Sequence, residues 1–234
     1  MIPIRDTVPR RHLPIVTWAL IAINVLVFLY ELSLGPRELG QLFYLFGIVP
    51  ARYSHPAWAQ WVGFPADDWW PFLTSMFLHG GWLHIIGNMW VLWIFGDNVE
   101  DVMGPLRYFL FYMVCGLFAG VTQWLTNFSA TVPTIGASGA IAGVLGAYFV
   151  LFPRAKIVTL LPIFFWPFFV DLPAVFYLLM WFFLQLFSGA IAGLSSQVGG
   201  IAWWAHVGGF LFGALLCWWL VKRRRRRGRH LISA

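Results

Sequence analysis

The sequence predicts an all-α integral membrane protein with six transmembrane helices and a large interfacial first loop. Of its 234 residues, 60% are hydrophobic and only 10% are charged, and the mean hydropathy is +0.76. This composition is too apolar for a soluble domain. The apolar residues form segments of about 20 residues, the length of a helix that crosses a hydrocarbon core of about 30 Å. The sequence lacks the alternating strands typical of an outer-membrane barrel.

The predicted spans are bounded by charged and polar residues. Basic residues precede the first span and follow the last, and an acidic cluster ends the second. The spans are residues 14–33, 83–101, 106–124, 138–152, 173–190 and 201–221. They form one domain, residues 14–221, between an N-terminal tail of residues 1–13 and a basic C-terminal tail of residues 222–234.

Two further stretches contain many apolar residues but do not fit a span. Residues 34–82 hold five tryptophans among prolines and glycines, which favours short segments in the lipid headgroup region. Residues 157–170 are short for a crossing and contain Pro162 and Pro167, which would break a helix. We expect residues 157–170 to lie at the cytoplasmic interface.

The positive charges predict the orientation of the bundle. Six spans place both termini on one side of the membrane, and 13 of the 15 Lys and Arg residues fall there: Arg5, Arg10, Arg11, Arg107, Arg154, Lys156, Lys222, residues 223–227 and Arg229. Because cytoplasmic segments are enriched in Lys and Arg, both termini are predicted to be cytoplasmic. Positive charges at segment ends point to anionic lipid headgroups as partners, and not to nucleic acid.

A serine begins the fourth span. Gly139, Ala142, Gly143 and Gly146 follow Ser138 at helical spacing, so one face of this helix carries almost no side chain. Another backbone can pack closely against such a face. A serine at this place can be only an N-cap, or it can be a nucleophile.

The sixth span repeats this pattern around a histidine. His206, Gly209 and Gly213 are at i, i+3 and i+7, so two glycine faces can pack together and bring His206 toward Ser138. A neutral imidazole can accept the serine proton and return it to a leaving amine, as acyl transfer requires. The sixth span has no carboxylate to orient the histidine, so we predict a dyad without a third member.

The second span carries hydrogen-bond donors on one face, His84 and Asn88 at i and i+4. The second, fourth and sixth spans all begin on the non-cytoplasmic side, so these donors, Ser138 and His206 share one shallow depth. With the backbone N–H of Ser138, the donors can form an oxyanion hole. Each residue also has a purely structural interpretation, as a cap, a packing histidine or an interhelical hydrogen bond. Their coincidence at one depth favours catalysis.

Three segments resemble the signature segments of the rhomboid intramembrane serine proteases. They are Gly-Ala-Ser-Gly at 136–139, Ala-His-Val-Gly-Gly at 205–209, and residues 79–89, which begin His-Gly-Gly-Trp-Leu-His. Residues 95–100 also match the end of the second span in that family. The resemblance extends from the first span to the sixth and implies a rhomboid-like six-helix bundle.

The resemblance assigns a role to each candidate residue. It implies that Ser138 is the nucleophile, that His206 is the general base, and that His84 and Asn88 stabilise the oxyanion. It implies that the fifth span and the loop before the sixth form a lateral gate and cap. Supporting positions near the site are His79, Gly136, Gly139 and Gly209.

Two positions depart from the pattern of the family. Many members have Trp-Arg in the first loop, where this chain has Trp70 and Pro71. Some members carry an aromatic residue four positions after the serine, which stacks on the histidine, whereas this chain has Ala142. Other neighbours must therefore hold His206.

The resemblance implies a serine endopeptidase that hydrolyses peptide bonds in or near transmembrane segments of membrane proteins, with no cofactor. We expect a multi-pass protein of a bacterial-type plasma membrane, with its active site open to the extracytoplasmic side. The basic tail is expected to contact anionic headgroups. The alternative is a pseudoprotease that binds and escorts membrane proteins, but the intact Ser138 and His206 pair favours the protease.

Two other classes fit the sequence poorly. A transporter or channel is disfavoured because no charged residue lies in the middle of a span and no inverted repeat is visible. A metal site built from His79, His84 and His206 would lack the His-Glu-x-x-His pattern. We therefore expect no metal.

Overall fold

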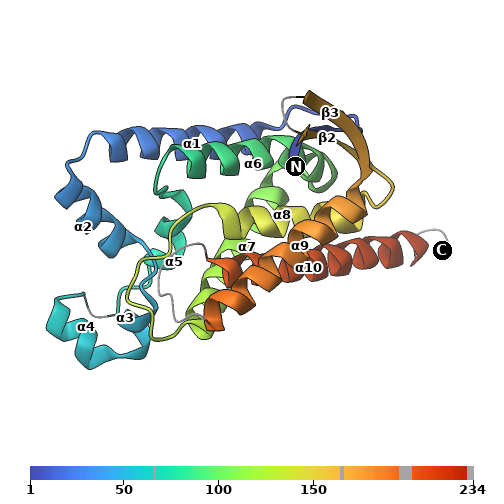
Figure 1. The fold of residues 1–234 in the computed structure, drawn as a ribbon. Helices are drawn as coiled ribbons and strands as arrows, with labels where there is room; N and C mark the ends of the chain where they lie inside the picture. The colour runs from blue at the N-terminus through green and yellow to red at the C-terminus, as the bar shows by residue number, and fades with distance from the viewer. Residues whose placement is uncertain (66, 164–165, 195–201, 231–234) are drawn as a thin grey trace.

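The computed structural model describes residues 1–65, 67–163, 166–194 and 202–230, and helices dominate it (Figure 1). The long helices are α1 (Ile15–Leu32), α6 (Trp82–Met103), α7 (Pro105–Thr126), α8 (Ser138–Leu151), α9 (Ala174–Leu194) and α10 (Trp203–His230). Each predicted span overlaps one of these helices, and the boundaries agree to within a few residues, apart from the end of α10. That helix continues through the basic residues, and residue 201, where the last span was expected to begin, lies outside the described residues.

Among the described residues, four helices are long and apolar enough to cross a membrane. They are Ile15–Leu32, Pro105–Thr126, Ala174–Ala192 and Trp203–Lys222. The helix α8 is apolar but has only 14 residues, which gives a length of about 21 Å against a hydrocarbon core of about 30 Å. The chain is therefore a multi-pass helical membrane protein with a short helix among longer ones.

The first loop folds into short helices at one end of the bundle (Figure 1). These are α2 (Pro36–Phe46), α3 (Pro50–Ser54), α4 (Pro56–Val62), α5 (Pro71–Thr74) and the 3-10 turn η1 (Ser75–Phe77). All four α-helices begin with proline, whose fixed φ suits a first turn and whose missing N–H is not needed there. Pro71, one of the two positions that depart from the family pattern, is thus a helix start.

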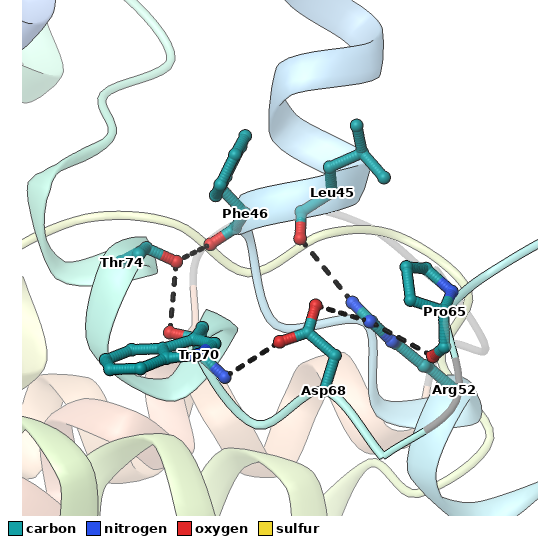
Figure 2. A network of polar contacts seen from close by, with 7 residues as sticks. All are labelled: Leu45, Phe46, Arg52, Pro65, Asp68, Trp70 and Thr74. Atoms are coloured by element: carbon teal, nitrogen blue, oxygen red, sulfur yellow. Dashed lines mark hydrogen bonds and ion pairs between the residues drawn. The ribbon is translucent and has the colours of Figure 1, made fainter.

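Arg52 ties this loop together from its interior (Figure 2). The residue is 5% exposed, and its guanidinium donates to the carboxylate of Asp68 at 2.7 Å and to the carbonyl oxygen of Pro65 at 3.3 Å. The second carboxylate oxygen of Asp68 accepts the backbone N–H of Trp70 at 3.1 Å. The loop therefore has a buried arginine, supplied by α3 and not by position 71.

A three-stranded sheet departs from the expected all-α fold. The strands β1 (Ile2–Asp6), β2 (Lys156–Ile163) and β3 (Trp166–Pro173) pair antiparallel in the order β1-β2-β3. Residues 157–163 and 166–170, part of the stretch that we expected at the interface, thus lie in the paired strands β2 and β3. The prolines in this stretch exclude a helix, and the stretch is too short to cross the membrane as a helix. Pairing as strands therefore supplies hydrogen-bond partners for its backbone N–H and C=O groups.

The sheet is fixed to the helices by polar contacts of β1, so the predicted N-terminal tail is partly structured. One carboxylate oxygen of Asp6 accepts hydrogen bonds from the Asn98 amide on α6 and from the Tyr148 hydroxyl on α8, both at 2.6 Å. The indole N–H of Trp90 donates to the carbonyl oxygen of Pro3 at 2.6 Å. The sheet and the first loop lie at opposite ends of the bundle (Figure 1).

The core centres on α8. Every residue of this helix from Gly139 to Tyr148 is buried, and α8 packs against α10, α7 and α6. The longer helices therefore surround the helix that begins with Ser138.

Candidate active site

Ser138 follows a loop whose backbone only glycine adopts easily. Gly136 has a φ of +122°, in the region that favours glycine, and its N–H donates to the carbonyl oxygen of Ser75 at 2.8 Å. Ala137 is the N-cap residue and Ser138 is the first residue of α8. The Ser138 side chain therefore does not occupy the N-cap position, which removes the simplest structural explanation for this serine.

The structure brings Ser138 and His206 together. Nε2 of His206 lies 2.7 Å from the Ser138 hydroxyl oxygen. His206 is 8% exposed and lies in the first turns of α10. A hydroxyl and an imidazole at this distance can exchange a proton.

Close packing of α8 and α10 produces this distance. A methyl group added at Gly209 would overlap the carbonyl oxygen of Gly139, and one at Gly213 would overlap that of Gly143. One at Gly146 would overlap the carbonyl oxygen of Phe210. The two glycine faces thus meet at backbone contact, as the spacing predicts.

The two proposed oxyanion donors lie beside the loop that leads to Ser138. A Cβ added at Gly136 would lie 2.6 Å from Nε2 of His84 and 3.7 Å from Nδ2 of Asn88. Both side chains project from α6 toward the backbone two residues before the serine. The structure therefore brings the N-terminal ends of α6, α8 and α10 together in a single site.

His79 supports Asn88 from the loop before α6. The Asn88 amide donates to Nε2 of His79 at 3.0 Å, while Nδ1 of His79 faces the carbonyl oxygen of Phe77 at 3.3 Å. Burial, and then the nearby His84, lower the pKa of His79 to about 4, so its imidazole is neutral at pH 7 and can accept. The His79 backbone N–H donates to the Glu31 carboxylate on α1 at 3.1 Å.

Two side chains of α9 contact His206, and no motif in the sequence marks them. Nδ1 of His206 lies 2.7 Å from Oε1 of Gln185, and the ring centroids of Trp181 and His206 are 6.0 Å apart. Trp203 is a further ring neighbour at 6.3 Å. Gln185 could have been found as a polar residue inside an apolar span, since such residues usually mark function.

One predicted part of the site lies outside the described residues. This is the loop before the last span, residues 195–200, which we expected to act as a cap. The helix α9, the expected gate, is described and packs mainly against α10. Its contact with His206 links that helix directly to the site.

Together these observations define a helical membrane protein that holds a half-buried serine and a buried histidine in hydrogen-bond contact. The family model described as "Rhomboid domain" matches residues 66–223. This match spans more than half of the chain and includes Ser138 and His206. The chain belongs to the rhomboid family.

Proteins from yeast, a plant and a bacterium are similar to this chain. Rhomboid protein 1, mitochondrial, of Saccharomyces cerevisiae is 32% identical over 167 residues, 69% of this chain and 45% of the relative. Rhomboid-like protein 11, chloroplastic, of Arabidopsis thaliana is 31% identical over 120 residues, 51% of this chain and 39% of the relative. Rhomboid protease GluP of Bacillus subtilis is 38% identical over 80 residues, 34% of this chain and 15% of the relative. The matched parts thus cover less than half of each relative.

Proposed function

We propose that this protein is an intramembrane serine endopeptidase that hydrolyses peptide bonds in or near transmembrane segments of other membrane proteins. The observation that carries the proposal is the 2.7 Å distance between Nε2 of His206 and the Ser138 hydroxyl, inside a helical bundle. Membership of a family that includes a named protease, GluP of Bacillus subtilis, supports it.

The proposed reaction has two halves. In the first, His206 Nε2 accepts the Ser138 proton while the serine oxygen bonds to the scissile carbonyl carbon. The carbon–nitrogen bond then breaks, the leaving amine takes the proton from His206, and an acyl-enzyme remains. In the second, His206 accepts a proton from water, the hydroxide attacks the ester, and the serine regains its proton as the carboxylic acid product leaves.

In this proposal His84, Asn88 and the backbone N–H of Ser138 stabilise the oxyanion of each tetrahedral intermediate. The positions of both side chains beside Gly136 support this role. The fixed amide of Asn88, held by His79 at 3.0 Å, needs little reorganisation when negative charge develops. Removing one such donor typically lowers kcat by about 100- to 1000-fold.

The proposed membrane arrangement has six spans, formed by α1 and by α6 to α10, with both termini in the cytoplasm. Because α8 is about 21 Å long and the hydrocarbon core is about 30 Å thick, Ser138 at its start lies below the extracytoplasmic surface and not at it. The basic residues after Val221 then contact anionic headgroups of a plasma membrane. In this proposal a transmembrane substrate reaches the site from the lipid side.

A fluorophosphonate probe tests the proposed activity. The serine oxygen displaces fluoride from phosphorus and forms a stable adduct, so we expect labelling of the purified protein in lipid, mapped to Ser138 by mass spectrometry. Labelling should disappear in Ser138→Ala and fall at least about 1000-fold in His206→Ala, because the serine then lacks its base.

The same variants separate the protease from a pseudoprotease that only escorts membrane proteins. In membranes holding a panel of single-span proteins, the wild type should cleave some of them and Ser138→Ala none. An unlabelled wild-type protein that binds single-span proteins without cleaving them would support the escort function instead.

A further inference from the structure

Both ring nitrogens of His206 have a partner. Nε2 lies 2.7 Å from the Ser138 hydroxyl, and Nδ1 lies 2.7 Å from the side-chain oxygen of Gln185. A neutral imidazole carries one N–H, so only one nitrogen can donate while the other accepts. The partner at Nδ1 therefore decides whether Nε2 is free to accept the serine proton.

The partner at Nδ1 comes from a different helix from either reacting residue. Gln185 and Trp181 are four residues apart on α9, so they lie on one face of that helix. Trp181 flanks the His206 ring with its centroid 6.0 Å away and its plane inclined by 36°. Gln185 thus contacts the edge of the imidazole ring and Trp181 flanks the ring, and both side chains come from one face of α9.

We propose that Gln185 is a positioning residue that selects the reactive tautomer of His206. This inference rests on the proposed function of Ser138 and His206. The Gln185 oxygen accepts the Nδ1 hydrogen, which leaves the lone pair of Nε2 directed at the Ser138 hydroxyl. In the opposite tautomer the hydrogen sits on Nε2, and the serine proton has no acceptor.

An amide suits this place better than a carboxylate does. The Gln185 side chain orients the ring without placing a full negative charge in an apolar span, where charge is expensive. It also gives up the extra stabilisation that a carboxylate offers to the imidazolium. Ser138, His206 and Gln185 therefore have the arrangement of a catalytic triad, in which the third member, Gln185, is neutral.

The other neighbours of His206 do not substitute for this contact. Trp203 lies edge-on to the ring, its centroid 6.3 Å away. Among the described residues, His84 on α6 is the titratable group with an electrostatic effect on His206, and it is not hydrogen-bonded to Nδ1. Among the described residues, the Gln185 oxygen is the acceptor that the structure assigns to Nδ1.

The test compares three substitutions in the full-length protein in lipid. Gln185→Met keeps the length of the side chain but removes the amide. Gln185→Glu keeps an acceptor and adds charge. Leu184→Met is the matched control, because Leu184 is the adjacent residue on α9 and is 55% exposed.

The kinetics of inactivation by a fluorophosphonate provide the first readout. Gln185→Met should lower the maximal inactivation rate by about 10- to 100-fold at pH 7.5, less than the roughly 10,000-fold loss known for a wrong tautomer in a charged triad. The half-saturating probe concentration should stay within about twofold, since a tautomer affects reaction more than binding. Leu184→Met should match the wild type in both parameters.

The acceptor-only variant provides a readout that a purely structural role would not change. Gln185→Glu should recover most of the rate lost in Gln185→Met. It should also move the acidic limb of the pH–rate profile to higher pH by about one unit, because the added carboxylate favours the protonated imidazole. A profile unchanged in position, with a rate as low as that of Gln185→Met, would overturn the proposed acceptor role.

Nitrogen NMR of histidine-labelled protein reads the tautomer without any activity. The experiment uses Ser138→Ala, and the His206 signal is assigned as the one that disappears in Ser138→Ala/His206→Ala. This signal should show the hydrogen on Nδ1. Adding Gln185→Met should shift it toward a mixture of the two tautomers. Unchanged tautomer and inactivation rates in Gln185→Met, with an active wild type, would overturn the inference alone. A wild type that no probe labels would overturn the proposed function instead, whatever the tautomer.

Discussion

A single buried arginine organises the first loop, which contacts the segment before Ser138 through Ser75 and Gly136. The side chain of Arg52 is 2% exposed and that of its partner Asp68 is 24% exposed. The guanidinium also reaches backbone oxygens of Leu45 and Pro65, which lie on either side of it in sequence. Arg52 thus joins Leu45 of α2 to Pro65 and Asp68, which precede α5.

This contact predicts a loss of stability that does not depend on Ser138 or His206. Arg52→Leu leaves one carboxylate oxygen of Asp68 and two carbonyl oxygens without their guanidinium donor, which should cost about 2 kcal/mol. For a chain of this size we expect the unfolding midpoint to fall by roughly 5 °C, measured by thermal unfolding in detergent. Arg37→Leu, at an exposed arginine of α2, is the control. Equal midpoints for the two variants would show that the Arg52 network does not stabilise the loop.

At the same scale, sequence motifs predicted the candidate pair Ser138 and His206 but not two residues that support the candidate site. Ser138 and His206 stand in short motifs with small neighbours, so their chemistry can be read from residue type and spacing. Gln185 and Glu31 lie in apolar helices without a local motif, and their partners are 21 and 48 positions away in sequence. Only the folded chain pairs them.

The glycine faces of α8 and α10 decide how the helices meet. Because the backbones are in contact, neither helix can withdraw to make room for a side chain at Gly209 or Gly213. The position of His206 relative to Ser138 is therefore fixed by residues that carry no chemistry of their own.

Gly209→Ala tests this dependence. Its methyl group would overlap a backbone carbonyl, which cannot rotate away, so we expect a loss of about 1–3 kcal/mol in stability. Displacement of His206 should also slow fluorophosphonate labelling of Ser138 by about 100-fold.

The matched control is Gly87→Ala on α6, a helical glycine with open space around an added Cβ within the described structure. It should label at the rate of the wild type and unfold at an equal or slightly higher temperature. If Gly209→Ala behaved in the same way, close approach of the backbones would not be what positions His206 beside Ser138.

The elements show why the expected all-α fold was incomplete. Hydrophobic periodicity and length identify the long helices, because an apolar run of about 20 residues has few alternatives in a membrane. The strands β1 and β2 are about 150 residues apart in the chain, and their pairing of Ile2 with Leu160 depends on a register that the sequence alone does not express. Pro162 of β2 and Pro167 of β3 indicated only that no helix would form.

For the whole molecule, the distribution of charge predicts the orientation. The basic run after Val221 and the strands lie at the end of the bundle opposite the first loop (Figure 1). If positive charge marks the cytoplasm, the candidate site opens on the other side. The yeast and plant relatives carry the words mitochondrial and chloroplastic in their names, so the plasma membrane stays a proposal for this chain.

Reporter fusions in a bacterial host check this orientation. Green fluorescent protein fused after the last residue should fluoresce, and alkaline phosphatase at the same place should be inactive, because the C-terminus is predicted to be cytoplasmic. The pattern should reverse when the reporters are fused in the loop between α7 and α8, near Phe128. Active phosphatase at the C-terminus would contradict the orientation and place the candidate site on the cytoplasmic side.

The sequence by itself determined the class of protein, the positions of the long helices and the residues able to do chemistry, because hydrophobic length, charge bias and short motifs are local properties. The tertiary structure decided which of those residues meet, what holds them and where strands replace helix. These depend on contacts between distant segments, such as Gln185 with His206 and Asp6 with Tyr148. A helix face can be read from spacing, but its partner is fixed only when the backbones pack.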